Sequence, residues 1–194
     1  MRVIAGAAKG RPLRAPAGER TRPTADRVKE AWFSSLQARL PGAHVLDLFA
    51  GSGQLGLEAL SRGAAAVTFV ERDRRAVQAL RANVATVDLP GARVVAGDVA
   101  DLLRGPLDGS PFDVVVADPP YGLADADLAA VLSALVPHHL AAGAVVTVER
   151  ARRSGPVAWP STAGEADGPR YGDVDARRYG DTVLHRATFL EPAS

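Results

Sequence analysis

Short, continuously apolar runs alternate with longer amphipathic stretches between residues 43 and 148. The apolar runs predict strands at residues 45–49, 67–70, 92–96, 112–117 and 144–148. The stretches between them repeat their apolar positions every three or four residues and predict helices at residues 55–62, 73–87 and 128–140. Strands that are apolar on both faces are typical of a parallel sheet covered by helices on both sides. The pattern therefore predicts an α/β fold with a mostly parallel sheet.

The two ends of the chain depart from this alternation. Residues 1–23 are rich in Gly, Pro and Arg, which predicts a small β-hairpin around a glycine-containing turn. Pro23 and Thr24 then open a helix, whose apolar positions repeat from Val28 to Leu36 and which ends by Pro41-Gly42. After Glu149, glycine and proline are frequent, so we expect loops through Arg178 and a last strand at residues 182–190. This ending suggests two antiparallel strands at one edge of the sheet.

Composition excludes several classes of site. None of the 194 residues is cysteine, which excludes disulfide scaffolds, thiolate zinc sites and cysteine nucleophiles. The four histidines include no pair spaced i, i+4, so we expect no metal site. No run of 18 apolar residues occurs, and the first residues contain no apolar signal segment. We therefore expect a cytoplasmic protein that does not contact the membrane.

Charge is distributed unevenly along a chain whose formal net charge is +1. Residues 1–30 have a net charge of +5, and the rest of the chain has a net charge of −4. A basic segment on a mildly acidic body predicts an anionic partner, nucleic acid first, and a solvated arm without a partner is the alternative. We therefore divide the chain into a basic extension, residues 1–23, and a main domain, residues 24–194. The candidate RNA-binding residues are Arg2, Lys9, Arg11, Arg14, Arg27 and Lys29.

A glycine-rich turn follows the first predicted strand. Gly51, Gly53 and Gly56 have the G-x-G-x-x-G spacing, and Glu71 lies 20 residues after Gly51. In doubly wound sheets a nucleotide binds at such a turn, because the glycines let the backbone approach the ligand closely. The acid at the end of the second strand accepts hydrogen bonds from ribose hydroxyls. This motif alone does not separate a dinucleotide site from a site for S-adenosylmethionine (SAM).

Two further acids favour SAM. Asp47 places a carboxylate just before the glycine turn, where it would repel a pyrophosphate but stabilise the ammonium group of SAM. Asp98 follows the third predicted strand, where it can accept from an adenine amino group and also cap the next helix. The candidate cofactor-binding residues of this region are Asp47, Phe49, Gly51, Ser52, Gly53, Glu71, Asp98 and Val99.

The sequence Asp118-Pro119-Pro120-Tyr121 follows the fourth predicted strand, at the edge where such sheets bind ligands. Two prolines make a stiff bend without free N–H groups, so their carbonyls can point into the site. An acid, a rigid carbonyl and an aromatic ring suit a planar base with an exocyclic amino group, on which the ring stacks. We expect these four residues to form the catalytic site.

Taken together, these motifs resemble a known family, the bacterial 16S ribosomal RNA (rRNA) guanine-N2 methyltransferases called RNA small-subunit methyltransferase D. The resemblance covers nearly the whole chain, but it is weak at residues 151–178. The similar stretches are residues 2–6, 9–11, 21–24, 26–36, 46–53, 56–64, 70–71, Asn83, 118–121, Glu149 and 179–181. The glycine turn and the D-P-P-Y sequence are shared by many amino-methyltransferases, and the N-terminal combination is the more specific part.

The resemblance implies a seven-stranded SAM-dependent methyltransferase fold, Rossmann-like, with helices on both faces. It implies methylation of one guanine N2 in 16S rRNA, the small ribosomal subunit or an assembly intermediate, with S-adenosylhomocysteine as the product. It also implies that Arg22, Pro23 and Thr24 lie near the methionine end of SAM. The expected reaction is a direct displacement in which nitrogen, methyl carbon and sulfur are aligned. The target base would leave its stack to reach the pocket.

Three alternatives stay open at this point. The D-P-P-Y sequence also occurs in adenine-N6 DNA methyltransferases, although 23 N-terminal residues leave little room for a sequence-reading region. A nicotinamide-dependent dehydrogenase fits the glycine spacing, but Asp47 and the lack of a hydride-transfer His or Tyr-Lys pair count against it. A non-catalytic RNA-binding assembly factor fits the basic extension, but the intact Asp118 indicates retained chemistry.

Overall fold

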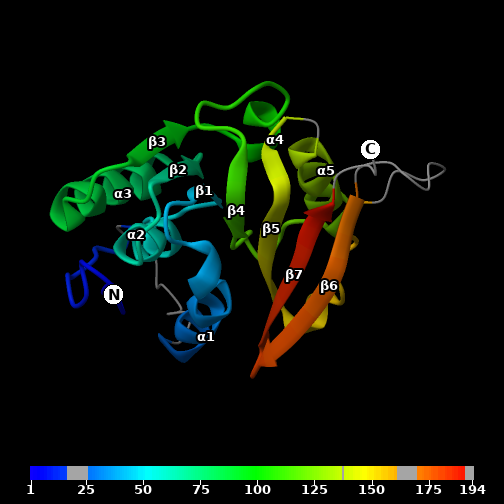
Figure 1. Ribbon diagram of the computed structural model, residues 1–194, viewed down its shortest axis with the longest axis horizontal. Coiled ribbons are helices and arrows are strands. Elements are labelled where there is room, and N and C mark those ends of the chain that lie inside the picture. The colour runs from blue at the N-terminus through cyan, green and yellow to red at the C-terminus, as the bar shows by residue number, and fades with distance from the viewer. Residues whose placement is uncertain (17–25, 137, 161–169, 191–194) are drawn as a thin grey trace.

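A seven-stranded sheet forms the centre of the protein in the computed structural model, which describes residues 1–16, 26–136, 138–160 and 170–190 (Figure 1). The strand order is β3-β2-β1-β4-β5-β7-β6. The strands are β1 (His44–Leu48), β2 (Ala66–Glu71), β3 (Ala92–Ala96), β4 (Phe112–Ala117), β5 (Leu140–Ala151), β6 (Arg170–Tyr179) and β7 (Thr182–Leu190). The helices are α1 (Asp26–Leu36), α2 (Gln54–Ser61), α3 (Arg74–Val87), α4 (Val99–Leu102) and α5 (Asp125–Leu135), with 3-10 turns η1 (Gln37–Arg39) and η2 (Arg152–Ser154).

The strands β1 to β5 all run parallel, and only β7 runs against its neighbours β5 and β6. The carboxyl ends of β1, β2, β4 and β5 therefore meet at one edge of the sheet, which we call the carboxyl edge. This observation confirms the expected mostly parallel sheet with an antiparallel pair at one edge. It places every residue that follows one of these strands within the same region of the molecule.

Two hydrophobic cores flank the sheet, as expected for strands that are apolar on both faces. One core joins alternate strand residues to α1, α2 and α3, and it contains the fully buried Trp32 and Phe33. The other core joins the remaining strand residues to α4 and α5 and contains Phe112. The alternation along each strand sends neighbouring side chains to opposite cores, which stabilises the sheet from both sides.

Three predictions about the second half of the chain need correction. The predicted loops after Glu149 include a strand, β6, which packs at the outer edge of the sheet against β7. Its sequence is exposed and charged, so the apolar pattern did not predict a strand there. An edge strand needs few apolar residues. Helix α5 occupies residues 125–135 instead of 128–140, and its start carries Asp125 and Asp127, which are favourable near a helix N-terminus. Strand β5 begins at Leu140 and extends to Ala151.

The N-terminal segment forms a small hairpin that is closed by one antiparallel bridge, between Arg2 and Pro12, and not by two regular strands. Some of its backbone donors bond within the hairpin, and others go to helix α2. The N–H groups of Ile4 and Ala5 donate to the Glu58 carboxylate at 2.7 and 3.1 Å, and the Ala8 N–H donates to the Ser61 hydroxyl at 2.9 Å. The segment is therefore docked on the main domain and does not project as an arm.

The apolar side of this segment also joins the core. Val3, Ala8 and Leu13 are buried in the same cluster as α1 and α2. None of the helices in the described part of the chain is both long and apolar enough to cross a membrane.

Candidate active site

The glycine turn between β1 and α2 is the first part of the candidate site at the carboxyl edge. Gly51 and Gly53 have positive φ angles of 55° and 84°, a conformation that favours glycine. A Cβ atom at Gly51 would meet nothing within 4 Å, so this glycine faces open space. A Cβ atom at Gly56 would lie 2.2 Å from Cε1 of Phe69. The first glycine therefore leaves room for a ligand, and the third lets α2 pack against β2.

Glu71, at the end of β2, braces this turn. Its Oε2 accepts the Gly51 N–H at 2.8 Å, and its Oε1 accepts the N–H groups of Arg72 and Asp73 at 2.8 and 2.7 Å. Each carboxylate oxygen can accept more than one hydrogen bond, so capacity remains for ligand hydroxyls. Phe49, directly after β1, is half-buried and also has a positive φ angle of 58°.

Asp47 lies beneath the turn and is 1% exposed. Its Oδ2 accepts the Gly56 N–H at 2.8 Å, which fixes the start of α2. The pKa of Asp47 is raised to about 8, mainly by burial. The Gly56 hydrogen bond opposes this shift, and the nearby Asp118 and Glu71 carboxylates contribute to it. None of the groups that shift this pKa among the described residues is a cation.

Asp98 caps helix α4, as the sequence allowed. Its Oδ1 accepts the Ala100 N–H at 2.9 Å, and its Oδ2 pairs with Nη1 of Arg72 at 3.0 Å. The side chain remains 37% exposed and can still meet a ligand. The neighbouring Val99 is buried.

The D-P-P-Y sequence begins directly after β4. Asp118 stays open to solvent, but the protein atoms around its carboxyl group displace enough water to raise its pKa to about 6. Pro119 is buried, and the Pro120 carbonyl accepts the Leu123 N–H at 2.9 Å. That bond closes the turn, so the expectation that both proline carbonyls point into the site is wrong for Pro120. The Tyr121 side chain is 59% exposed.

Glu149 is a site residue that the motif reasoning missed. It follows Val148, which pairs with Ala117 across the β4–β5 ladder, so it lies next to Asp118. Its side chain is 4% exposed; Oε1 accepts the Thr182 hydroxyl at 3.4 Å, and Oε2 has no hydrogen-bond partner among the described residues. The available signal was the same as for Asp118, an acid at the carboxyl end of an apolar run.

The electrostatic environment of Glu149 is unusual. Burial first, and the Asp118 carboxylate second, raise the pKa of Glu149 to about 8. The Thr182 hydroxyl and the Lys29 ammonium group act in the opposite direction. Asp47, Glu71, Asp118 and Glu149 thus form a chain of mutually repelling carboxyl groups along the carboxyl edge. Such a site favours a cationic ligand over a pyrophosphate.

The prediction that Lys29 binds RNA is wrong. The Lys29 side chain is 2% exposed, and it lies between α1 and the sheet near Glu149, where it cannot reach RNA phosphates. Its spacing from Trp32 and Leu36, on the buried face of α1, was the signal for this position.

The other predicted RNA-binding residues differ in their surroundings. Arg2 and Lys9 are exposed. Arg11 donates to the carbonyls of Thr86 and Val87, at the C-terminus of α3, and the Arg14 backbone pairs with the Asn83 amide. The side chain of Arg27 and the predicted cofactor residues Arg22, Pro23 and Thr24 lie outside the described residues.

Asn83 connects the N-terminal segment to the glycine turn. Its Nδ2 donates to the carbonyls of Arg14 and Ser52, both at 2.9 Å. Ser52, a predicted cofactor residue, is itself buried in the turn. Within the described ranges, no group of three His, Cys, Asp or Glu side chains is arranged to hold a metal ion.

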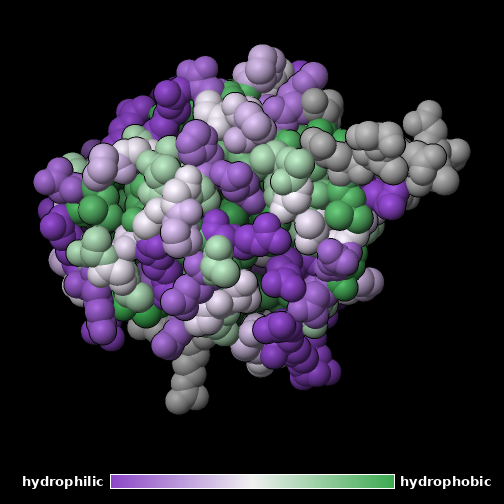
Figure 2. Space-filling view, viewed as in Figure 1, coloured by the Kyte–Doolittle hydropathy of each residue, from purple (hydrophilic) through white to green (hydrophobic). Residues whose placement is uncertain are grey.

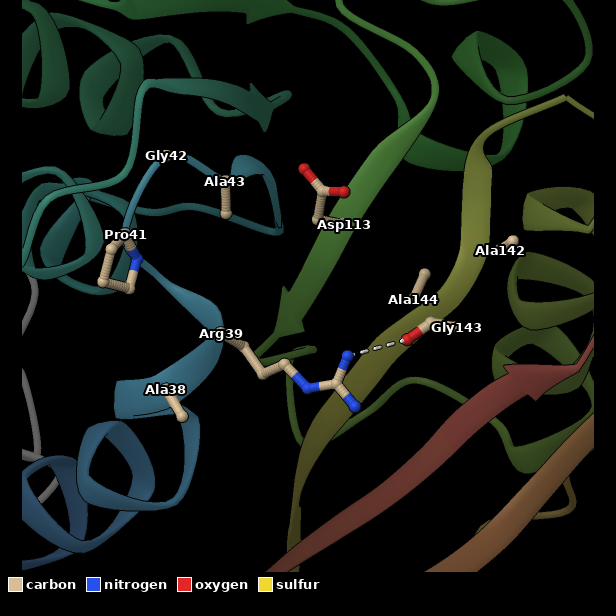
Figure 3. Close-up of a pocket in the computed structure, with 9 residues that line it drawn as sticks. All are labelled: Ala38, Arg39, Pro41, Gly42, Ala43, Asp113, Ala142, Gly143 and Ala144. Atoms are coloured by element: carbon tan, nitrogen blue, oxygen red, sulfur yellow. Dashed lines mark hydrogen bonds between the residues drawn. The ribbon is translucent and has the colours of Figure 1, made fainter.

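A pocket of about 260 Å³ lies at the opposite, amino edge of the sheet (Figure 3). It is lined mainly by small residues and by Arg39 and Asp113, and Nη1 of Arg39 donates to the Gly143 carbonyl at 3.4 Å. Asp113 accepts the His44 N–H at 2.8 Å. None of the predicted site residues lines this pocket, so it is separate from the candidate active site.

Comparisons with known proteins agree with this geometry. The model of the family described as Conserved hypothetical protein 95 matches residues 1–180. The Ribosomal RNA small subunit methyltransferase D of Escherichia coli strain K12 is 45% identical over 121 residues, which span 62% of this chain and 60% of the relative. The protein of the same name from Haemophilus influenzae is 43% identical over 123 residues, which span 62% of this chain and 64% of the relative.

Solved structures share the whole fold. A protein from Escherichia coli, provisionally named as the methyltransferase yhhF, has a TM-score of 0.77 and 34% identity, with 98% of each chain covered. A protein from Haemophilus influenzae, provisionally named as a methylase, has a TM-score of 0.74 and 30% identity, with 98% of this chain and 99% of that chain covered. The chain therefore has the Rossmann-like SAM-dependent methyltransferase fold.

Proposed function

The chain belongs to the family described as Conserved hypothetical protein 95, and from this premise we propose that it is a SAM-dependent methyltransferase of small-subunit rRNA that methylates a guanine N2. The observation that carries the proposal is the position of Asp118 and Tyr121 on a carboxyl edge rich in acidic groups. The names of the two rRNA methyltransferase relatives support the RNA substrate. The choice of guanine N2 rests on the family resemblance and on the chemistry of the site.

The residues along the carboxyl edge fit SAM. The ligand would supply an electrophilic methyl group on a cationic sulfur. Asp47 and Asp118 repel each other in its absence, so a bound cation would lower the pKa of Asp47 and stabilise both carboxylates. Glu71 would accept from ribose hydroxyls, and Asp98 from the adenine amino group. The open space at Gly51 admits the ligand to the backbone of the turn.

The base would bind between Asp118 and Tyr121. The Tyr121 ring, exposed over more than half of its surface, would stack on the flipped base. The Asp118 carboxylate would accept a hydrogen bond from the exocyclic amine and orient the nitrogen lone pair toward the methyl carbon. With a pKa of about 6, Asp118 is mostly ionised at neutral pH and can accept this bond.

The methyl-transfer step requires little proton movement before the transition state. The N2–methyl bond forms as the sulfur–methyl bond breaks, and positive charge develops on N2. The Asp118 carboxylate stabilises that charge and then accepts the N2 proton, which leaves a neutral methylated amine. Alignment of the two reactants supplies most of the remaining acceleration.

The dehydrogenase alternative is disfavoured by the acidic site. A dinucleotide pyrophosphate carries two negative charges, which would bind beside the Glu71 carboxylate and above the buried Asp47 carboxyl group. Calorimetry with SAM, S-adenosylhomocysteine and NAD distinguishes these ligands. We expect binding of the first two only, and binding of NAD alone would contradict the methyltransferase proposal.

The decisive experiment is transfer of a labelled methyl group from SAM to 16S rRNA and to small subunits that lack the modification, followed by nucleoside analysis. We expect N2-methylguanosine at one position, and transfer at least about a hundredfold slower by the Asp118→Asn variant. A product of N6-methyladenosine would support the adenine-N6 alternative. Binding of RNA without any methyl transfer would support the assembly-factor alternative.

A further inference from the structure

Arg153 lies beside the candidate base-stacking residue. It belongs to η2, the turn that leaves the carboxyl end of β5, and its guanidinium carbon lies 6.0 Å from the centre of the Tyr121 ring. Both side chains are exposed. A guanidinium over an aromatic face is attracted by the ring and limits its rotation. One face of Tyr121 therefore meets a cation at the entrance to the site.

The two side chains are held by one scaffold. The buried Arg150, at the end of β5, donates through Nη1 to the Leu123 carbonyl at 3.3 Å and pairs through Nη2 with Asp125. These bonds tie the loop that follows Tyr121 to the strand from which η2 starts. The loop carrying the ring and the turn carrying Arg153 are thus anchored to the same strand end.

The turn is anchored on its other side as well. The Arg152 N–H donates to the Asp181 carbonyl at 2.8 Å, in the tight turn between β6 and β7. Figure 2 shows hydrophilic residues gathered over this tip of the β6–β7 hairpin. Among the described residues, no carboxylate pairs with Arg152 or Arg153. Their charges are therefore available to an anionic partner.

Acidic and basic groups are separated around the site in a way that suits the base and the phosphates of a nucleotide. The carboxyl groups of Asp118 and Glu149 lie where the β4–β5 pairing ends, and there an amino group is favourable and a phosphate is not. The guanidinium of Arg153 lies outside them, beside Tyr121, where a phosphate is favourable. A base drawn into the site would leave its flanking phosphates at this basic rim.

We propose that Arg153 is a substrate-binding residue, which holds a phosphate next to the target base and fixes the Tyr121 ring on which that base stacks. This proposal rests on the proposed function and extends it to a segment where the family resemblance is weak. The phosphate contact gives a role to the positive charge of Arg153, and the ring contact explains why its guanidinium lies beside Tyr121.

The test compares Arg153→Ala and Arg153→Lys with Arg39→Ala. Arg39 is an exposed arginine at the amino edge of the sheet (Figure 3). Tyr121 lies at the opposite, carboxyl edge, so Arg39→Ala removes one positive charge far from that ring. The measurements are KM for RNA, the salt dependence of RNA binding, the single-turnover rate with saturating RNA, and SAM affinity.

We expect Arg153→Ala to raise KM for RNA roughly tenfold, as for a lost hydrogen bond between charged groups. The salt slope should fall by about 0.7 to 0.9, the change for one phosphate. The saturated rate and SAM affinity should stay within about threefold of wild type, because the guanidinium makes no contact with the reacting atoms. Arg153→Lys should restore the wild-type salt slope, because the ammonium group keeps the charge. It should reverse only part of the rise in KM, because the planar contact with the ring is lost.

An Arg153→Ala variant whose KM and salt slope match those of Arg39→Ala would overturn the proposal. Loss of SAM affinity in Arg153→Ala would overturn it too, since it would indicate a structural role. Failure of the proposed function looks different, because the wild-type protein itself would then transfer no methyl group to RNA.

Discussion

Asp118 and Glu149 stand side by side where the pairing of β4 with β5 ends, each one residue beyond the Ala117–Val148 pair. The first side chain is open to solvent, and the second is 4% exposed. The Asp118 carboxylate contributes to the raised pKa of Glu149. At neutral pH the pair therefore holds one proton, mainly on Glu149, and Asp118 is the ionised member.

This relationship predicts how methyl transfer depends on pH. The single-turnover rate should rise with pH through a midpoint at or slightly below 6, because only ionised Asp118 stabilises positive charge on the base amine, and a cationic ligand lowers its pKa. Asp118→Asn should reduce the rate at least about a hundredfold and leave RNA affinity nearly unchanged. A flat profile between pH 5 and pH 8, or a near-normal rate in Asp118→Asn, would contradict this role.

Glu149 predicts a pH dependence of stability. Its pKa is raised in the folded state, so the folded protein binds its proton more tightly than the unfolded chain does. That contribution to the free energy of unfolding is complete below the ordinary carboxyl pKa and is lost as pH rises toward about 8. Glu149→Gln should therefore stabilise the protein at pH 8 relative to pH 5, by about 1 kcal/mol or more.

Urea unfolding of Glu149→Gln at both pH values measures this difference. Glu30→Gln, at an exposed carboxylate of α1, is the matched control and should show no such pH-dependent gain. Equal behaviour of the two variants would argue against a buried, protonated Glu149.

Two glycines of the G-x-G-x-x-G sequence, Gly51 in the turn and Gly56 in α2, should respond differently to an added methyl group. Gly56→Ala places Cβ against the Phe69 ring, which should cost about 1–3 kcal/mol of unfolding free energy. The Cβ atom of Gly51→Ala would meet no protein atom within 4 Å. Its positive φ angle should lower the free energy of unfolding by only about 1 kcal/mol. Its methyl group would instead occupy the open space over the turn, so SAM affinity should fall by tenfold or more.

Thermal unfolding and calorimetry with SAM separate these two effects. If Gly51→Ala bound SAM as tightly as wild type, the open space at Gly51 would not belong to the cofactor site.

Glu58 should be a main determinant of how the N-terminal segment is held. Its carboxylate accepts the N–H groups of Ile4 and Ala5, and it also pairs with Arg62 at 2.7 Å. Glu58→Ala would leave these donors without their acceptor and should lower the free energy of unfolding by about 1.5–3 kcal/mol. Glu30→Ala, at an exposed position on α1, should change it by less than about 0.5 kcal/mol. Denaturant titration of both variants gives the comparison.

The docked segment makes point substitutions a cleaner test of RNA binding than truncation. Removal of residues 1–16 would expose core around Val3 and Leu13 and destabilise the whole domain. Arg2→Ala combined with Lys9→Ala removes only two exposed charges. If both contact phosphates, the salt slope of RNA binding should fall by about 1.4 to 1.8. An unchanged slope, equal to that of an Arg104→Ala control, would assign the segment a structural role.

The local pattern of the sequence was sufficient for the parallel part of the sheet and for the place of the candidate site. Apolar runs depend on neighbouring residues, and they located β3, β4 and β7 at their observed bounds. Because parallel strands end at a common edge, the acids that follow them were expected to lie together. The glycine turn, Glu71 and Asp118 therefore meet at the edge that the sequence indicated.

Only the tertiary structure decided the surroundings of individual charges. Lys29 counts as a basic surface residue in the sequence, but packing between α1 and the sheet buries it near Glu149. Strand β6 exists because β7 offers it hydrogen-bond partners, and not because its own residues are apolar. The approach of Arg153 to Tyr121 joins residues 32 positions apart. Burial, pKa and cation contacts arise from long-range packing, which a periodicity of three or four residues does not encode.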